Sequence, residues 1–248
     1  MTVPESHPRY LSLMIRDRLV DGLKRGLAAP QGLIAHGRGE AFDYLLGERT
    51  TAAAREAIRA SAIALLLAKR PAISVNGNVA SLCSREISEL ANALRCPAEV
   101  NLFHRTEARV NLVAEELEGS GCRIVLGRDP DSRIPGLDHA RALASSKGIF
   151  NADVVLIPLE DGDRCEALKR MGKTVIAIDL NPLSRTAKLA DITIVDNIIR
   201  AVPVLTEEVE LQKALGDITP IHEFDNGSNL KTSLDLMARR YIRSDNED

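Results

Sequence analysis

Two runs of sequence decide the fold: DVVLIP (153–158) and TVIAIDL (174–180), which are separated by a segment of helical character at 161–171. Both runs are apolar at successive positions rather than at alternate ones, which is typical of strands that are covered on both faces. A strand, a helix and a second strand of this kind form a βαβ unit with a right-handed crossover. This stretch therefore predicts a parallel sheet with helices packed on its faces.

The same alternation extends outward in both directions along the chain. Further strands are predicted at AISVN (72–76), AEVNLF (98–103), RIVLG (123–127) and DITIV (191–195). Helices are predicted at roughly 79–94, 106–118, 138–147, 184–190, 197–215 and 228–243. Strands that alternate with helices in this way predict an α/β fold with a doubly wound, mainly parallel sheet of six strands.

Upstream of about residue 70 the pattern is helical. Apolar residues at spacings of four predict an amphipathic helix that Pro30 ends, and they are Leu11, Ile15, Leu19, Leu23 and Leu27. The next stretch, GLIAHGRGEAFDYLLGE (32–48), predicts a Gly-rich loop before a helix-like run, and a further helix is predicted at 50–70. We therefore expect a helical arm with a Gly-rich loop at 1–70, packed as one structural unit on an α/β domain at 71–248.

Composition excludes several classes of function. The formal net charge is −3 and aromatic residues make up 3% of the chain, so nucleic acid is not an expected partner. The four cysteines are widely scattered, which predicts buried thiols in a reducing compartment rather than a disulfide framework. The five histidines are dispersed as well, and they form no zinc-ligand motif.

No membrane association is expected from the sequence. The most apolar stretch, residues 60–68, has about half of the ~20 residues that a membrane span needs. The N-terminal residues are polar and lack the apolar core of a signal peptide. We therefore expect a cytoplasmic protein.

Ligands of open parallel sheets bind outside the carboxyl ends of the strands, and the richest strand end here is IDLNPLSRTA (178–187). Asp179 ends an apolar strand, where a carboxylate can accept hydrogen bonds from ribose hydroxyls. Ser184, Arg185 and Thr186 then open a helix, where hydroxyls, amide groups and a guanidinium favour an anion. The alternative is a capped helix with a surface arginine.

Three other segments are weaker candidates for an anion or nucleotide site. In VNGNV (75–79) a strand passes into a helix, which suits either an anion site or a plain tight turn. In HGRGE (36–40) two glycines flank Arg38, which suits phosphate or is simply a Gly-rich turn. In DNIIR (196–200), Asn197 either reads an adenine edge or only caps a helix.

Taken together, five runs resemble the archaeal 4-phosphopantoate–β-alanine ligases, a family also called phosphopantothenate synthetases. They are SHPRY (6–10), GLIAHGRGEAFDYL (32–45), VNGN (75–78), DLNPLSRTA (179–187) and DNIIRA (196–201). The resemblance extends from about Ser6 to about Arg240. It implies a Rossmann-like fold, a homodimer and a reaction of archaeal coenzyme A biosynthesis.

The implied reaction uses ATP and Mg²⁺ to convert 4-phosphopantoate to an acyl-adenylate, which β-alanine then attacks to give 4′-phosphopantothenate and AMP. By resemblance, the ATP contacts are Arg16, Arg38, Asp179, Leu180, Asn181, Arg185, Thr186, Asn197 and Ile198. Among them, Arg38 and Arg185 are the expected catalytic residues. Asn76, Gly77, Asn78 and His36 are the expected contacts of the acid substrate, and the metal ligands are not assigned.

Two rival functions stay open at the level of sequence. The same sheet could serve an oxidoreductase or isomerase that binds NAD or a sugar phosphate, although the GxGxxG motif of dinucleotide-binding proteins is absent. A dimer that senses nucleotides without consuming them is the non-enzymatic alternative.

Overall fold

The computed structural model describes residues 4–7, 9–216, 218–219 and 224–244. Its main sheet has six parallel strands in the order β3-β2-β1-β6-β7-β8. These strands are β1 (Pro71–Val75), β2 (Ala98–Val100), β3 (Val125–Leu126), β6 (Val154–Pro158), β7 (Thr174–Ile178) and β8 (Ile192–Ile194). The predicted doubly wound parallel sheet is confirmed, and its strand order is that of a Rossmann-like fold.

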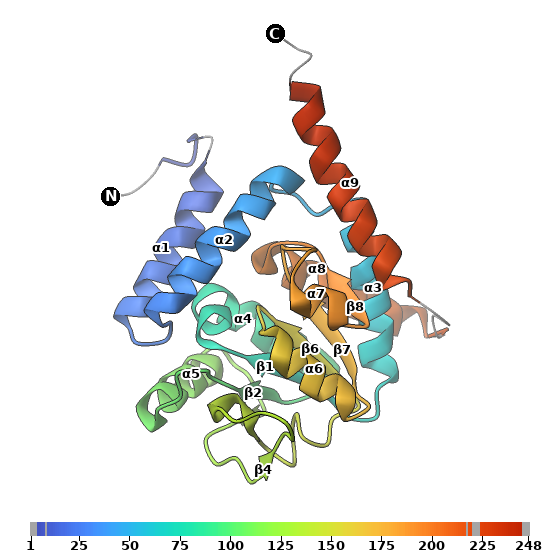
Figure 1. The fold of residues 1–248 in the computed structure, drawn as a ribbon. Helices are drawn as coiled ribbons and strands as arrows, with labels where there is room; N and C mark the ends of the chain where they lie inside the picture. Colours follow the sequence, from blue (N-terminus) through green and yellow to red (C-terminus); the bar gives the residue numbers. More distant parts are fainter. Residues whose placement is uncertain (1–3, 8, 217, 220–223, 245–248) are drawn as a thin grey trace.

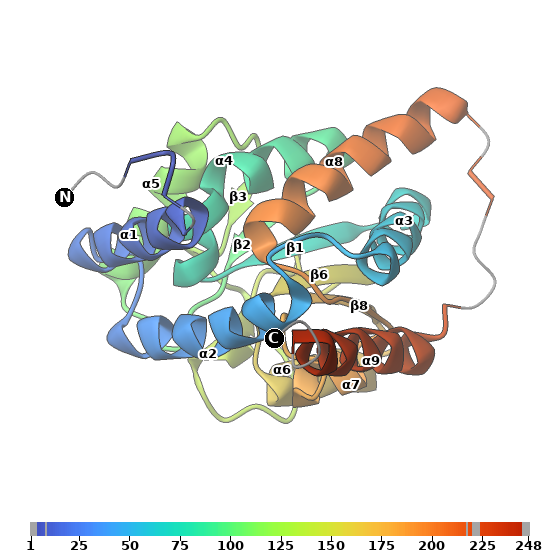
Figure 2. The ribbon, with the colours of Figure 1, turned by 90° about the horizontal axis from the view of Figure 1, so that it is seen from above.

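Helices cover both faces of the sheet (Figures 1 and 2). One face packs against α4 (Gly77–Leu94), α5 (Glu107–Gly119) and α8 (Ile198–Leu215), with α3 (Ala52–Leu67) beside α8. The other face carries α6 (Gly162–Arg170) and α7 (Arg185–Leu189). The last helix, α9 (Asn226–Ser244), packs on α2 (Pro30–Leu46), α3 and α7.

Strand β6 shows why these strands are apolar at successive positions. Val154 and Leu156 belong to the core under α4 and α8, whereas Val155 and Ile157 belong to the core on the opposite face. All four side chains are buried. Continuous apolarity thus reflects two hydrophobic cores that share one sheet.

The N-terminal arm consists of α1 (Tyr10–Lys24), α2 (Pro30–Leu46) and α3. The predicted Gly-rich loop is wrong, because Gly37 and Gly39 lie inside α2. Pro30 does not end the first helix; it occupies the first turn of α2, where its missing N–H costs nothing. Gly47, in the left-handed region at φ 88°, ends α2.

The predicted helix at 138–147 is also wrong. This stretch instead contains a short 3₁₀ turn, η1 (Ala140–Ala142), and β5 (Leu143–Ala144), which pairs with β4 (Ser132–Arg133). Buried polar side chains from β2 and the residue that follows it hold its backbone. The amide of Asn101 donates to the carbonyls of Arg141 and Leu143, and the carboxylate of Glu99 accepts from the backbone amides of Ser145 and Ile149.

Three further observations concern expectations from the sequence. Among the described residues, no helix has both the length and the apolar character that crossing a membrane requires. Cys83, Cys96, Cys122 and Cys165 are all free thiols and buried, as expected. In the SHPRY run, Pro8 lies outside the described residues.

At Gly77 the backbone of α4 lies close to the N-terminal arm. A Cβ atom there would lie 2.1 Å from the carbonyl oxygen of Leu27, so Gly77→Ala should lower the free energy of unfolding by roughly 1–3 kcal/mol. Gly37 lies in the interior of α2 with nothing within 4 Å of such an atom, so Gly37→Ala should raise it by about 0.5–1 kcal/mol. Urea unfolding of both variants checks these opposite signs, and a loss of stability in Gly37→Ala would contradict the helical assignment of this glycine.

Candidate nucleotide and acid site

The candidate site lies where the order of the sheet reverses, between β1 and β6. The connections that follow these two neighbouring strands run in opposite directions, which opens a crevice at the carboxyl ends of the strands. A cavity of about 400 Å³ occupies this end of the sheet. Its walls come from α2, α4, the loops after β6 and β7, and the start of α8, and comprise Ala35, His36, Arg38, Gly39, Asn78, Leu82, Leu159–Gly162, Asp179–Asn181, Ser184–Thr186, Asn197 and Ile198. We call it the first cavity.

The loop after β7 is held by the carboxylate of Asp179. One carboxylate oxygen accepts from the backbone amide of Asn181 at 2.9 Å, and the other accepts from the hydroxyl of Ser184. Ser184 also caps α7 by accepting from the backbone amide of Ala187 at 2.9 Å. Burial raises the pKa of Asp179, while these hydrogen bonds and the charge of Arg38 act in the opposite direction. These hydrogen bonds hold the loop in this conformation.

The side chains of Arg185 and Thr186 differ in how accessible they are to a ligand. Arg185 pairs with Glu166, but its side chain is 60% exposed and lines the first cavity. The hydroxyl of Thr186 is buried and donates to the carbonyl of Glu160 at 2.8 Å. Thr186 thus joins the loop after β6 to α7, and Arg185 is the more accessible of the two.

Asn197 caps α8, as one of the two sequence interpretations predicted. Its side-chain amide donates to Asp43 of α2 at 2.9 Å, so the side chain is engaged within the protein. Arg200 lies between two buried carboxylates: it donates to Asp43 at 3.1 Å and to Asp196 at 3.0 Å. These contacts fix α2 against the start of α8.

Helix α2 forms one wall of the first cavity and contributes Arg38 and His36 to it. Arg38 is exposed, and its charge acts on Asp179 across the cavity. His36 is half-buried, and burial lowers its pKa, which favours the neutral imidazole. The sequence predicted these side chains at the site, but it assigned them to a loop instead of a helix.

Arg16 is not among the residues that line the first cavity. Its guanidinium pairs with Glu40 at 2.8 Å and donates to the hydroxyl of Tyr44 at 3.0 Å. These contacts link α1 to α2. The contact of Arg16 with ATP stays a prediction.

A second cavity, of about 300 Å³, adjoins the first and shares Ala35, Asn78, Leu159 and Asp161 with it. The rest of its lining is Ala29, Gln31, Gly32, Asn76, Gly77, Leu102, Phe103, His104, Arg109 and Arg141. Asn76 and Gly77, which were predicted to contact the acid substrate, thus line the second cavity, Asn78 lines both, and His36 lines only the first.

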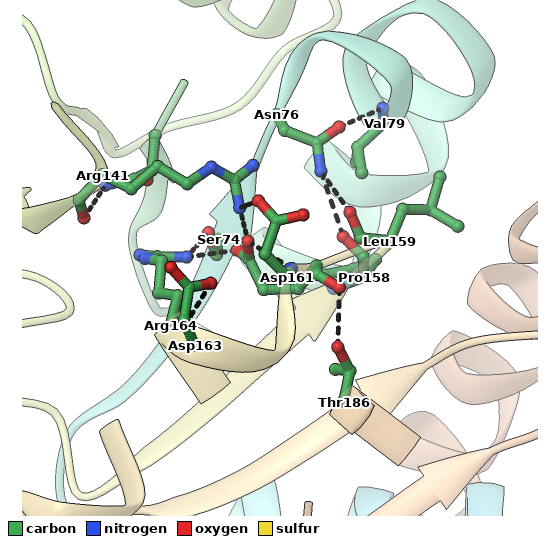
Figure 3. Close-up of polar contacts among 12 residues, drawn as sticks. Ser74, Asn76, Val79, Arg141, Pro158, Leu159, Asp161, Asp163, Arg164 and Thr186 are labelled. Carbon is green, nitrogen blue, oxygen red and sulfur yellow. Dashed lines mark hydrogen bonds and ion pairs between the residues drawn. The ribbon is translucent and has the colours of Figure 1, made fainter. Parts of the chain in front are cut away.

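Asn76 connects the two strands at the reversal point (Figure 3). Its side-chain oxygen caps α4 by accepting from the backbone amides of Asn78 and Val79 at 3.0 and 3.1 Å. Its side-chain amide donates to the carbonyls of Pro158 and Leu159 at 3.3 and 2.9 Å. The end of β1 and the loop after β6 are thereby held together beside both cavities.

Sequence reasoning missed the contributions of Glu160 and Arg141. Glu160 is buried and pairs with both Arg141 and Arg164. Arg141 was missed because residues 138–147 were assigned to a helix. One signal for Glu160 was available in the sequence: it comes just after Pro158, where β6 ends, and such strand ends are where parallel sheets place their sites. Within the residues that the structure describes, no three His, Cys, Asp or Glu side chains gather to hold a metal ion.

An open parallel sheet with a polar cavity at its reversal point defines a Rossmann-like protein with a candidate ligand site at the ends of β1, β6, β7 and β8. Comparisons with known proteins give the family. A family model described as phosphopantothenate/pantothenate synthetase matches residues 53–240. This chain belongs to that family.

Proteins named 4-phosphopantoate–β-alanine ligase are similar to this chain over most of their length. The one from Thermococcus onnurineus is 56% identical over 236 residues, which cover 94% of this chain and 90% of the relative. The one from Thermococcus kodakarensis is 54% identical, with 98% and 95% covered. The one from Methanosarcina mazei is 52% identical, with 94% and 92% covered.

The ion pairs of Arg200 give a test of the network that positions Asn197. In Arg200→Met, two buried carboxylates lose their cation, so the free energy of unfolding at neutral pH should fall by roughly 3–5 kcal/mol. Burial already raises the pKa of Asp196, and loss of Arg200 removes the main opposing influence. The penalty for the charged carboxylate applies above this raised pKa and is lost as the pH falls through it, so the deficit should shrink toward acid pH.

Urea unfolding of wild type and Arg200→Met at neutral and mildly acid pH checks this prediction. Arg85→Met is the matched control, because Arg85 makes an exposed pair with Glu89 on α4 and should change stability by less than about 1 kcal/mol. A deficit in Arg200→Met that does not depend on pH would mean that Asp196 is not the group responsible.

Proposed function

We propose that this protein is an ATP-dependent ligase that joins 4-phosphopantoate to β-alanine and forms 4′-phosphopantothenate, AMP and pyrophosphate. The observation that carries the proposal is the first cavity, where Arg38, Arg185, the Asp179–Asn181 loop and the start of α8 meet from separate elements. The membership of the family and the names of its relatives support the same reaction.

In the proposed binding mode, ATP occupies the first cavity. The carboxylate of Asp179 accepts hydrogen bonds from the ribose, and Asn181 stands beside it. The backbone of Ile198 contacts adenine, and Asn197 holds the start of α8 in place through its bond to Asp43. Arg38 and Arg185 contact the phosphates, where their planar guanidinium groups suit oxygen pairs.

In the first chemical step, a carboxylate oxygen of 4-phosphopantoate attacks the α-phosphorus of ATP, and the bond to the bridging oxygen of pyrophosphate breaks. In the second step, the amine nitrogen of β-alanine attacks the acyl carbon, AMP leaves with the carboxylate oxygen, and the nitrogen releases a proton. Arg38 and Arg185 stabilise the negative charge that builds up at the α-phosphorus. The rate enhancement thus comes from the positioning of the reactants and from electrostatic stabilisation of the transition state.

Mg²⁺ would enter with ATP, held mainly by the phosphates. Sites for Mg²⁺ commonly combine substrate phosphates with one or two carboxylates. Asp161 fits this role, because its side chain is 53% exposed and lines both cavities. The free, buried thiols suit the reducing cytoplasm. We also propose that the protein is a homodimer, as the family resemblance implies.

The decisive experiment measures nucleotide release from ATP and Mg²⁺ with 4-phosphopantoate, with and without β-alanine. Strong AMP formation only with both substrates supports the proposed route. ADP in place of AMP would replace the acyl-adenylate with an acyl phosphate. Bound ATP without any nucleotide product would indicate a sensing protein, and stabilisation against heat by NAD but not by ATP would favour a dinucleotide enzyme.

Arg38→Ala should lower turnover by at least ~100-fold, as expected for loss of a main charge donor at a transition state. Arg38 is exposed, so the variant should fold normally. Arg59→Ala, on the exposed face of α3, serves as the control. Steady-state kinetics checks this outcome, and near-normal turnover of Arg38→Ala would remove Arg38 from the site.

A further inference from the structure

A cavity lined by basic side chains lies at the amino ends of the strands, at the opposite end of the sheet from the first cavity. It has a volume of about 400 Å³ and lies where α3 passes into β1 and α4 passes into β2, beside the turn that precedes β6. We call it the basic pocket, and its wall consists of Lys69, Arg70, Pro71, Arg95, Cys96, Pro97, Ser146, Lys147, Gly148 and Asn151. Because β1 has five residues, the basic pocket and the first cavity lie about 16 Å apart along this strand.

The wall of the basic pocket carries charge of one sign. Its four charged side chains are the exposed cations Lys69, Arg70, Arg95 and Lys147, and it includes no Asp or Glu among the described residues. Within the same part of the chain, none of the four cations makes an ion pair. The chain as a whole has a formal net charge of −3, so this cluster is not a general property of its surface. A cavity lined by one sign of charge attracts counter-ions.

Two carboxylates adjoin the wall, and both are used to hold its backbone. Asp153 accepts from the backbone amides of Lys69 and Arg70 at 2.8 and 2.9 Å. Asp131 accepts from the backbone amide and the hydroxyl of Ser146 at 2.6 and 2.5 Å. The turns that carry three of the four cations are thus fixed by hydrogen bonds.

Lys173 offsets part of the negative charge of these carboxylates. It is buried, its ammonium donates to the carbonyl of Ala152 at 2.7 Å, and it interacts with the charge of the neighbouring Asp153. The surroundings of the basic pocket therefore keep a clear excess of positive charge.

The backbone at Arg95 gives a second, independent indication of a site. Helices α4 and α5 end in the same way, with one left-handed residue followed by a cysteine whose amide donates back to the helix at 3.0 Å. In α5 the left-handed residue is Gly121, at φ 87°, as is usual for such helix ends. In α4 it is Arg95, at φ 53°, where a side chain costs conformational energy. The chain thus tolerates strain at a position that places a guanidinium in the basic pocket.

We propose that the basic pocket binds a small inorganic polyphosphate, such as pyrophosphate or tripolyphosphate. A compact anion with several negative charges matches cations that come from three separate segments, and arginine and lysine both suit phosphate oxygens. The wall offers no aromatic side chain for a base to stack on, since its apolar members are Pro71, Cys96 and Pro97, so we do not expect a nucleotide there. This ligand class follows from the wall of the pocket and does not rest on the proposed function.

Calorimetric titration with tripolyphosphate and with inorganic phosphate tests the proposal. We expect the wild-type protein to bind tripolyphosphate at least tenfold more tightly than inorganic phosphate, because more of the cations are engaged. The double variant Arg95→Asn/Lys147→Gln should weaken binding of tripolyphosphate by at least about tenfold. Both side chains are exposed, and asparagine tolerates the left-handed conformation, so this variant should fold normally.

Arg55→Gln/Arg59→Gln is the matched control, because it removes the same amount of charge from the exposed face of α3, outside the pocket. Its affinity for tripolyphosphate should stay within about twofold of wild type. Equal weakening in the two double variants would indicate a general effect of net charge and would overturn the proposal. Loss of binding in Arg38→Ala, with binding kept in Arg95→Asn/Lys147→Gln, would place the anion in the first cavity instead. Binding that disappears at about 150 mM salt would indicate an adventitious ion only.

Chemical labelling of lysines locates the anion directly. We expect tripolyphosphate to protect Lys69 and Lys147 of the wild-type protein from an amine-reactive reagent, while Lys24, which is exposed on α1, reacts at an unchanged rate. Mass spectrometry of the labelled peptides gives the three rates. Unchanged rates at both Lys69 and Lys147 would overturn the proposal.

Discussion

The side chain of Asn76 is the contact on which the site depends. Its oxygen caps α4, and its amide holds the carbonyls at the end of β6, so one residue joins the two halves of the sheet where their order reverses. Leu159, whose carbonyl accepts one of these bonds, has a left-handed φ of 53°. A non-glycine residue keeps this conformation only where its surroundings hold it. The crevice is therefore a fixed feature of the fold and needs no ligand to form.

Around this contact, buried charge determines how the loops lie. Glu160 lies between Arg141 and Arg164, Asp196 and Asp43 share Arg200, and Glu99 accepts two backbone amides. Buried charges persist only when paired or hydrogen-bonded, so each of these groups restricts the segments around it to one arrangement. The stretch from Ile134 to Ala152 is the clearest case, because its apolar side chains pack on the sheet while its backbone is held by Glu99 and Asn101.

The sequence predicted the sheet well because its signal is local. Strands such as 153–158 and 174–180 are apolar on both faces, and that property is visible in the residues themselves. Most predicted nucleotide contacts also meet in the first cavity, since the carboxyl ends of parallel strands share an edge. The failures have non-local causes. Gly37 and Gly39 indicated a loop, but Pro30 starts a helix there and Gly47 ends it. The pairing of Arg16 with Glu40, 24 residues away, is likewise invisible to local patterns, and the contact of Arg16 with ATP stays a prediction.

The packing of α2 has a consequence for how the protein is made. Helix α2 carries Arg38 to the first cavity, and among the described elements it packs mostly against α9. The ribosome completes α2 early and α9 only after every strand of the sheet, so α2 lacks its main support while the rest of the chain emerges. The strands can pair during synthesis, but the wall of the cavity that α2 provides gains its full support only after both α8 and α9 have docked. An enzyme built this way acquires its sheet first and its ligand site last.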